Sequence, residues 1–219
     1  MDDPVARTLA SYEGLADEYR DRHADRSVVA DAVERFDDAL GAARTGDGGS
    51  SDGSLPSDRP TCVLDVGCGP AWEAATLADR GHDVTAIDIT PAFLRQAGDV
   101  APSADRARMD MRSLAFAPGS FDGVWACASF LHVPREDAPA TLAGFERVLR
   151  DGGVLFCAVQ RGEGERDTEG SPYDAEDERR FTLYDPESFR EIVEDAGFTV
   201  DSLVTETDSH WLQVVARTA

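Results

Sequence analysis

The chain has 219 residues, of which 42% are hydrophobic and 29% are charged, and its formal net charge at pH 7 is -22. This length suits one medium-sized domain with a modest attachment and is sufficient to bury a substantial core. A surface so rich in carboxylates repels nucleic acids and anionic membranes, so we expect neither as a partner.

All 21 basic residues are arginines. An acidic surface without lysine suggests adaptation to molar salt, where the screening length shrinks to about 3 Å and surface charges repel one another little. Such screening also weakens the argument against nucleic acids. No apolar run is long enough to span a membrane, and the chain starts with the acidic sequence Met1-Asp2-Asp3-Pro4. We therefore expect a cytoplasmic, halophilic protein.

The four cysteines show no C-x-x-C pair and no histidine at the spacing of zinc ligands; they are Cys62, Cys68, Cys127 and Cys157. We therefore expect no metal site. Three of them lie in apolar runs, where a thiol commonly serves as a small buried hydrophobic group.

Residues 1–40 are expected to form a helical cap. Apolar and aromatic side chains recur there at helical spacing, first Tyr12, Leu15, Ala16 and Tyr19, and then Val29, Ala32, Val33, Phe36 and Leu40. Residues 41–60 are rich in Gly, Ser, Asp and Pro, which predicts a flexible connection.

From residue 61 to residue 219, short apolar runs alternate with amphipathic stretches, as in β-α-β units. Seven strands are predicted, at 62–66, 84–88, 106–109, 121–128, 154–159, 199–204 and 210–216. The expected fold is an α/β, Rossmann-like, doubly wound and mostly parallel sheet with N-terminal helices. The polar segment 161–180 leaves from the carboxyl edge of this sheet, and it is either a solvated loop or a lid that faces the substrate.

A glycine-rich turn follows the first predicted strand, with Gly67 and Gly69 allowing a ligand to approach the backbone closely. Asp88 ends the next strand, 23 residues after Asp65. A carboxylate at this distance from such a turn typically binds ribose hydroxyls, and its neighbour Ile89 is placed to pack on an adenine. Trp72 stands where a dinucleotide motif requires a small residue, which disfavours NAD or FAD.

These segments resemble the motifs of class I S-adenosylmethionine-dependent methyltransferases of the small-molecule type. Val63 to Ala71 is similar to their first motif and Val84 to Thr90 to their acidic ribose motif. Further similar segments are Met109 to Met111, Leu114 to Asp122, Ala128 to Val133, Val148 to Gly153 and, at the N-terminus, Tyr12 to Tyr19. The family often has a glycine where this chain has Ala71.

The resemblance implies S-adenosylmethionine as the cofactor and assigns residues to its parts. Asp65 with the backbone of Gly67, Cys68 and Gly69 would hold the amino-acid moiety, Asp88 the ribose, and Asp110 with Ile89 and Met111 the adenine. Structural roles stay open as alternatives: Asp65 could orient the turn, Asp88 could cap the helix after Thr90, and Asp110 could belong to a turn.

Tyr19 and His132 are the candidates for contact with the methyl acceptor, and Tyr19 is also a candidate cofactor ligand; either residue could instead serve in packing. The implied reaction is methyl transfer to a small molecule, which needs mainly orientation of the two reactants and no metal. A non-catalytic S-adenosylmethionine-binding sensor and a nicotinamide-dependent oxidoreductase remain as alternatives. Monomer and homodimer both remain open.

Overall fold

The computed structural model describes residues 3–46, 59–168, 171–173, 176–205 and 210–219. Its α-helices are α1 (Pro4–Arg22), α2 (Ala30–Gly46), α3 (Trp72–Asp79), α4 (Pro91–Val100), α5 (Ala138–Val148) and α6 (Pro186–Asp195). Its strands are β1 (Cys62–Val66), β2 (Asp83–Asp88), β3 (Asp105–Arg108), β4 (Phe121–Cys127), β5 (Leu149–Arg161), β6 (Glu165–Asp167), β7 (Arg180–Tyr184), β8 (Phe198–Thr205) and β9 (Trp211–Thr218). No helix among these residues is both long and apolar enough to cross a bilayer.

The central sheet is mostly parallel, as predicted. Strands β3, β2, β1, β4 and β5 lie side by side in that order and pair in parallel. Strand β9 pairs antiparallel with β5, and β8 pairs antiparallel with β9. The hairpin of β6 and β7 joins the carboxyl end of β5, where Gln160 pairs with Leu183.

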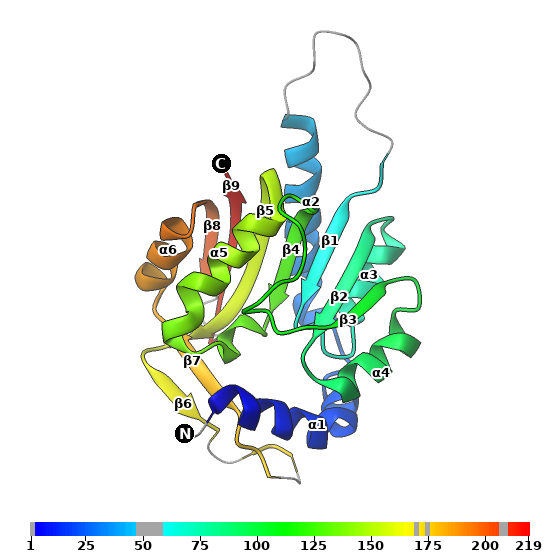
Figure 1. Cartoon of the computed structure of the whole chain (residues 1–219), viewed down its shortest axis with the longest axis vertical. Coiled ribbons are helices and arrows are strands. Elements are labelled where there is room, and N and C mark those ends of the chain that lie inside the picture. Colours follow the sequence, from blue (N-terminus) through cyan, green and yellow to red (C-terminus); the bar gives the residue numbers. More distant parts are fainter. Residues whose placement is uncertain (1–2, 47–58, 169–170, 174–175, 206–209) are drawn as a thin grey trace.

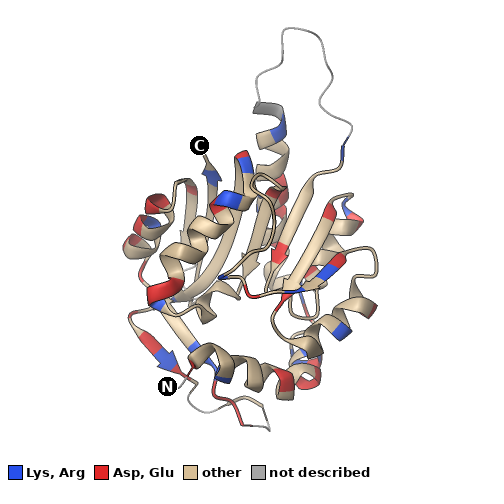
Figure 2. Ribbon diagram, viewed as in Figure 1, with Lys and Arg blue, Asp and Glu red and all other residues tan. Residues whose placement is uncertain are grey.

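Helices cover both faces of the sheet, which makes the fold doubly wound (Figure 1). Apolar side chains of α2, α3 and α4 share one buried cluster with the sheet, and those of α5 and α6 share a second. Helix α2 packs closely on Gly123 of β4, where an added Cβ would lie 2.7 Å from Phe36 and 2.8 Å from Leu40. Acidic side chains lie mainly on the outer helices and loops (Figure 2).

The structure has nine strands in its described part, where the sequence predicted seven. The two additional strands are β6 and β7, within and just beyond the polar segment 161–180. All three residues of β6 are exposed, so backbone pairing with β7 makes it a strand without any hydrophobic pattern. In β7, Phe181, Thr182 and Tyr184 are buried, a pattern that the polar residues before it obscured.

The predicted N-terminal helices are α1 and α2, and α2 continues to Gly46. Residues 41–46 of the predicted connection are therefore helical, because the alanines at 42 and 43 are strong helix formers. Residues 47–58 of that connection lie outside the described residues.

Helix α1 lies across the carboxyl ends of the parallel strands (Figure 1). The Glu13 carboxylate accepts a hydrogen bond from the Ala92 amide at the start of α4 (2.8 Å), and the Thr8 hydroxyl accepts one from the Arg180 amide at the start of β7 (3.1 Å). Helix α1 is thus attached to α4 on one side of the sheet edge and to β7 on the other, and it covers the carboxyl ends of the strands between them.

Candidate functional site

A cavity of about 750 Å³ lies between the carboxyl ends of the strands and the cap. One side, here called the strand wall, is formed by the residues that follow β1, β2 and β3, with Asp65 and Asp88 at the strand ends. The opposite side, here called the cap wall, is formed by Tyr12, Tyr19, His23, His132, Tyr173 and Arg179. All ten site residues predicted from the sequence line this cavity: Tyr19, Asp65, Gly67, Cys68, Gly69, Asp88, Ile89, Asp110, Met111 and His132.

The glycine turn of the strand wall is fixed to the neighbouring strand. The amides of Gly67 and Cys68 both donate to the carbonyl of Ile87, at 2.8 and 3.0 Å. Gly67 has a φ of +68°, and an added Cβ would collide with Ser129, whose hydroxyl donates to the Val66 carbonyl at 2.6 Å. Only glycine satisfies both the backbone angle and the close approach at this position.

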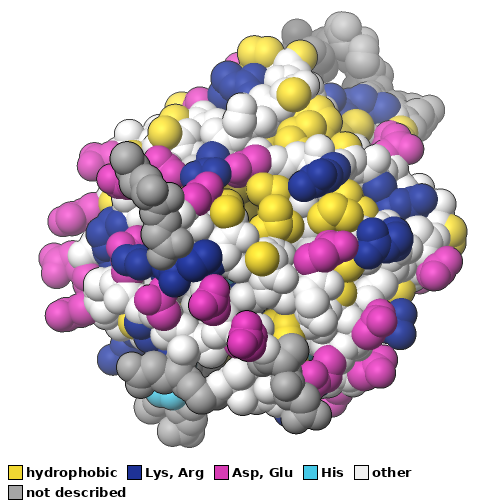
Figure 3. Space-filling view, turned by 60° about the horizontal axis from the view of Figure 1, so that its bottom comes forward, with side chains coloured by type: hydrophobic (Ala, Val, Ile, Leu, Met, Phe, Trp, Pro, Cys, Tyr) yellow, Lys and Arg dark blue, Asp and Glu magenta, His cyan; other side chains and the backbone are white. Residues whose placement is uncertain are grey.

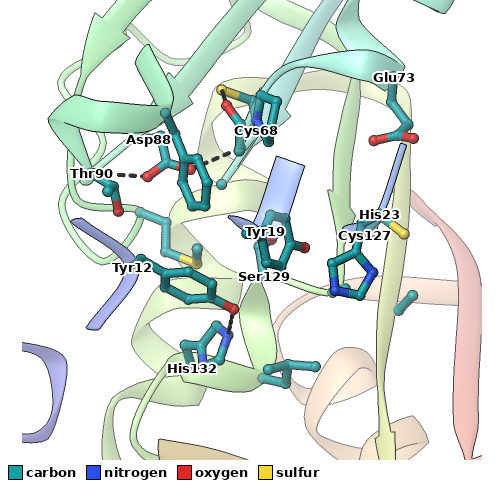
Figure 4. Close-up of a pocket in the computed structure, with 18 of the residues that line it drawn as sticks. Tyr12, Tyr19, His23, Cys68, Glu73, Asp88, Thr90, Cys127, Ser129 and His132 are labelled. Carbon is teal, nitrogen blue, oxygen red and sulfur yellow. Dashed lines mark hydrogen bonds between the residues drawn. The ribbon is translucent and has the colours of Figure 1, made fainter. Parts of the chain in front are cut away.

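Asp88 is 7% exposed and accepts two backbone hydrogen bonds, from Gly69 at 2.9 Å and from Thr90 at 2.7 Å (Figure 4). Burial raises the pKa of this carboxyl, although the amide hydrogen bonds oppose the shift. The carboxylate therefore supports the glycine turn and the start of α4 while it also lines the cavity, so the structural and the ligand-binding interpretations are compatible.

Asp65 is 2% exposed, and it accepts a hydrogen bond from the Ala74 amide. Its Oδ2 atom has no hydrogen-bond partner among the described residues. Burial, followed by the nearby Glu73 and Asp88 carboxylates, raises the pKa of Asp65 well above its usual value. A positively charged group in the cavity would relieve this excess of buried negative charge.

Asp110 follows β3 and pairs with Arg112, whose Nη2 lies 2.7 Å from Oδ2. The Arg112 amide also donates to Asp110 at 2.9 Å, so the carboxylate belongs to a tight turn. Burial disfavours its charge, but the hydrogen bonds from Arg112 outweigh that effect and lower the pKa of Asp110. Met111 in the same turn and Ile89 after β2 add apolar surface to the cavity.

A chain of hydrogen bonds crosses the cap wall, and Figure 4 shows its link between Tyr12 and His132. His132 Nδ1 lies 2.8 Å from the Arg180 carbonyl oxygen, which only accepts, so Nδ1 carries the proton. The bare Nε2 therefore accepts from the Tyr12 hydroxyl at 2.9 Å. The same hydroxyl accepts from Arg179 Nη1 at 3.3 Å, and Arg179 is held by Asp177 at 2.7 Å.

This network defines what His132 does in the structure. Both ring nitrogens are engaged, and burial lowers the pKa of His132 to about 4. The neutral imidazole therefore fixes the Tyr12 side chain, and it presents no free nitrogen to a ligand. Burial also raises the pKa of Tyr12 to about 12, so this phenol keeps its proton at neutral pH.

Tyr19 differs from Tyr12 because its hydroxyl faces the cavity and has no hydrogen-bond partner among the described residues (Figure 4). The sequence predictions included Tyr19 but missed Tyr173, Arg179 and the role of Tyr12. Tyr12 was assigned to a helix face and to the N-terminal motif, without a role of its own, and the other two lie in the segment 161–180. The interpretation of that segment as a substrate-facing lid was the signal that pointed to them.

Two alanines near the cavity adopt left-handed backbone angles, Ala71 with a φ of 69° and Ala128 with a φ of 56°. They are the only such non-glycine residues in the described ranges. Ala71 precedes α3, and Ala128 follows β4 and lines the cavity. Residues held in such angles occur frequently at functional sites.

Comparisons with known proteins point to methyltransferases. A family model described as a methyltransferase domain matches residues 63–153. The chain is 42% identical over 76 residues to the 18S rRNA (guanine-N(7))-methyltransferase of Bos taurus, covering 34% of this chain and 26% of the relative. It is 33% identical over 109 residues to the malonyl-[acyl-carrier protein] O-methyltransferase of Pseudescherichia vulneris, covering 49% of this chain and 43% of the relative. The matches thus span less than half the length of either relative.

Among solved structures, the fold is similar to that of 1,6-didemethyltoxoflavin-N1-methyltransferase from Burkholderia thailandensis, which was solved with 1,6-didemethyltoxoflavin and S-adenosylhomocysteine. The TM-score is 0.74 at 20% identity, and the alignment covers 100% of this chain and 92% of that one. Residues 63–153 therefore match a methyltransferase domain, and the chain has the fold of S-adenosylmethionine-dependent methyltransferases.

Proposed function

We propose that the protein binds S-adenosylmethionine on the strand wall and transfers its methyl group to a small molecule held against the cap wall. The observation that carries this proposal is the convergence of the glycine turn, Asp65 and Asp88 on one cavity, within the segment that matches the methyltransferase family model. The division into a cap at 1–40, a connection and a catalytic domain at 61–219 is part of this proposal.

The residues of the strand wall fit the cofactor. Asp65 offers a buried carboxylate oxygen without a partner, which suits the ammonium group of the methionine moiety. Asp88 lines the cavity at the end of β2, where a carboxylate suits the ribose hydroxyls, and Ile89 and Met111 offer apolar contact to the adenine. Asp110 is the weakest part of the assignment, because Arg112 already occupies its carboxylate.

Bound S-adenosylmethionine would supply a methyl group already activated on a sulfonium sulfur, so the protein's task is orientation. Holding two reactants in alignment is worth roughly 7 to 11 kcal/mol of the barrier. The cap wall is built for this task, because the Arg179, Tyr12 and His132 chain fixes the position of its side chains. Closure by α1 would also exclude water from the reacting atoms.

The size of the acceptor is inferred from the way the cap closes the cavity. Helix α1 and the segment before β7 lie over the strand ends and bind each other, for example where the Ser11 hydroxyl accepts from the Glu178 amide at 2.9 Å. Arginines on this face are interspersed with acidic side chains, and no continuous basic surface for a polyanion is visible (Figure 3). The relative that acts on 18S rRNA makes RNA the second candidate acceptor.

Calorimetry tests the cofactor. We expect S-adenosylhomocysteine to bind and NADH not to bind; tight NADH binding without any response to the thioether would refute the proposal. Incubation with methyl-labelled S-adenosylmethionine and either a deproteinised metabolite extract or purified rRNA then tests the acceptor. Label in low-molecular-weight product supports the small-molecule assignment, label in RNA contradicts it, and label in neither, with the cofactor bound, favours a sensor.

A further inference from the structure

The cap wall is distinguished by its aromatic rings. Tyr19 lies at their centre. Its ring centroid is 4.5 to 6.4 Å from those of three rings of this wall, Tyr12, His23 and Tyr173, and of two adjoining rings, Phe93 and Trp72. These rings come from α1, α3, α4 and the segment before β7, so the fold gathers them from four separate parts of the chain. Their distances are those of ordinary aromatic contacts, which means that the wall is packed and its ring faces are held in position.

Three guanidinium groups stack on these rings and restrict their positions further. Arg26 lies 4.8 Å from the Trp72 ring centroid, while Arg22 and Arg179 lie 5.4 and 5.0 Å from that of Tyr173. Such stacking is favourable because the ring face is electron-rich.

Each of the three guanidinium groups is also paired with a carboxylate. Arg26 lies 2.7 Å from Glu73, Arg22 lies 3.0 Å from Glu18, and Arg179 lies 2.7 Å from Asp177. The cap wall therefore carries positive charges that are already compensated, so it offers little selective attraction to an anionic acceptor or to a phosphate backbone. The surface that the cap wall presents to a ligand is flat, polarisable and close to neutral.

Of the three phenols of this wall, one is free among the described residues. The Tyr12 hydroxyl is used by His132 and Arg179, and the Tyr173 hydroxyl lies 2.9 Å from His23 Nε2. The Tyr19 hydroxyl has no partner in the part of the chain that the structure describes, and it faces the cavity. A ligand on this wall thus meets ring faces and one phenol that is able both to donate and to accept a hydrogen bond.

We infer that the methyl acceptor is a flat, uncharged aromatic or heteroaromatic molecule, which stacks on the rings of the cap wall and hydrogen-bonds to the Tyr19 hydroxyl through a ring substituent. A flexible acyl chain has no flat face with which to use these rings. The cavity, at about 750 Å³, has room for the cofactor and a molecule of one or two rings. The inference rests on the proposed function, because it assigns the strand wall to the cofactor.

Binding to the protein saturated with S-adenosylhomocysteine tests this inference without requiring turnover. The probes are catechol, naphthalenediol and lumazine, with cyclohexanediol and decalindiol as saturated analogues of the first two. Calorimetry is expected to show at least one aromatic probe binding, and the diols binding about tenfold more tightly than their saturated analogues. Failure of all three aromatic probes to bind, or equal binding of flat and saturated rings, would overturn the inference.

Three variants separate the ring faces from the hydroxyl. Tyr173→Leu, which keeps an apolar side chain but removes a ring face, is expected to weaken the aromatic probes about tenfold. Tyr19→Phe keeps the ring and removes only the hydroxyl, so it is expected to weaken the aromatic probes less, by roughly fivefold. The matched control is Phe116→Leu, which removes a ring outside the cavity, beside Phe121, and should leave probe binding unchanged.

The outcomes distinguish this inference from the proposed function. In one outcome, S-adenosylhomocysteine binds normally, but malonyl-acyl-carrier protein or rRNA binds more tightly than the aromatic probes and displaces them. The aromatic assignment is then wrong, and the methyltransferase assignment stands. If S-adenosylhomocysteine itself does not bind, both fail. Normal S-adenosylhomocysteine binding by Tyr173→Leu, together with loss of the aromatic probes, supports the inference and rules out simple misfolding of the variant.

Discussion

The two walls of the cavity are built in different ways. The strand wall comes from three consecutive β-strands, and its key atoms are carboxylates and backbone amides within 46 residues of one another, from Asp65 to Asp110. The cap wall combines α1, the turn after β4 and the segment before β7, so Tyr12 binds His132 across 120 residues of sequence. In the proposed function, the strand wall would bind the cofactor and the cap wall would select the methyl acceptor.

The largest effect is expected on the strand wall, from Asp88→Ala. Two charge-assisted hydrogen bonds that the Asp88 carboxylate would accept from the ribose hydroxyls are worth about 4 kcal/mol, so affinity for S-adenosylhomocysteine should fall roughly a thousandfold. Calorimetry measures this directly. Asp83→Ala is the matched control, because Asp83 is exposed at the opposite end of the same strand and should leave the affinity unchanged.

An affinity for Asp88→Ala within threefold of the wild type, in a variant that is still folded, would show that Asp88 only supports the turn and α4. The strand wall would then lose its assignment to the ribose, and the comparison between the two walls would lose its basis.

The strand wall was predictable because its geometry depends on local sequence. A strand, a glycine turn and an acidic strand end recur at short spacing, and parallel pairing brings the strand ends to one edge without further information. The same logic gave seven of the nine strands, with β6 and β7 missed.

The cap wall was only partly predictable, because its contacts join distant segments. His132 was found as a motif residue, but no sequence pattern shows that the Arg180 carbonyl fixes its tautomer or that Tyr12 occupies its other nitrogen. Arg179 was hidden for a related reason: its partners Asp177 and Tyr12 give the segment before β7 its order, and they are recognisable only in three dimensions.

The walls should also respond oppositely to acid. His132 has a pKa near 4 in the folded protein and near 6.5 when unfolded, so between these values the unfolded state binds a proton that the folded state does not. Its contribution to stability is therefore lost as the pH falls, by about 2.5 kcal/mol between pH 7 and pH 4.5. The pKa values of Asp65 and Asp88 are raised in the folded protein, so these two carboxyls hold protons that the unfolded state has released. Their effect on the free energy of unfolding therefore becomes more favourable as the pH falls.

Comparison of the wild type with His132→Asn isolates the contribution of His132 to the pH dependence of stability, because Asp65 and Asp88 are present in both proteins. Urea unfolding at pH 7 and pH 4.5 is expected to show a smaller loss of stability in the variant, by about 2.5 kcal/mol. Tyr12→Phe keeps the buried imidazole and should retain the wild-type pH dependence while it loses about 1 kcal/mol at pH 7. Identical pH dependence in the wild type and His132→Asn would mean that the imidazole is already accessible to solvent.

The smallest expected effect concerns the strain beside the strand wall, at Ala71. An alanine with left-handed backbone angles lowers the stability of the folded state by about 1 to 2 kcal/mol relative to glycine. Ala71→Gly would relieve that cost, but it would lose a buried methyl group worth about 0.8 kcal/mol and add unfolded-state entropy of about 0.5 to 1 kcal/mol. These terms nearly cancel, so the free energy of unfolding should change by less than about 0.5 kcal/mol.

The control Ala97→Gly makes the same chemical change in α4. Ala97 is equally buried but has the right-handed backbone angles of a helix, so its replacement should cost about 2 kcal/mol. Equal losses in the two variants, measured by urea unfolding, would mean that Ala71 is not strained, and that the strand wall binds its ligand on a relaxed turn.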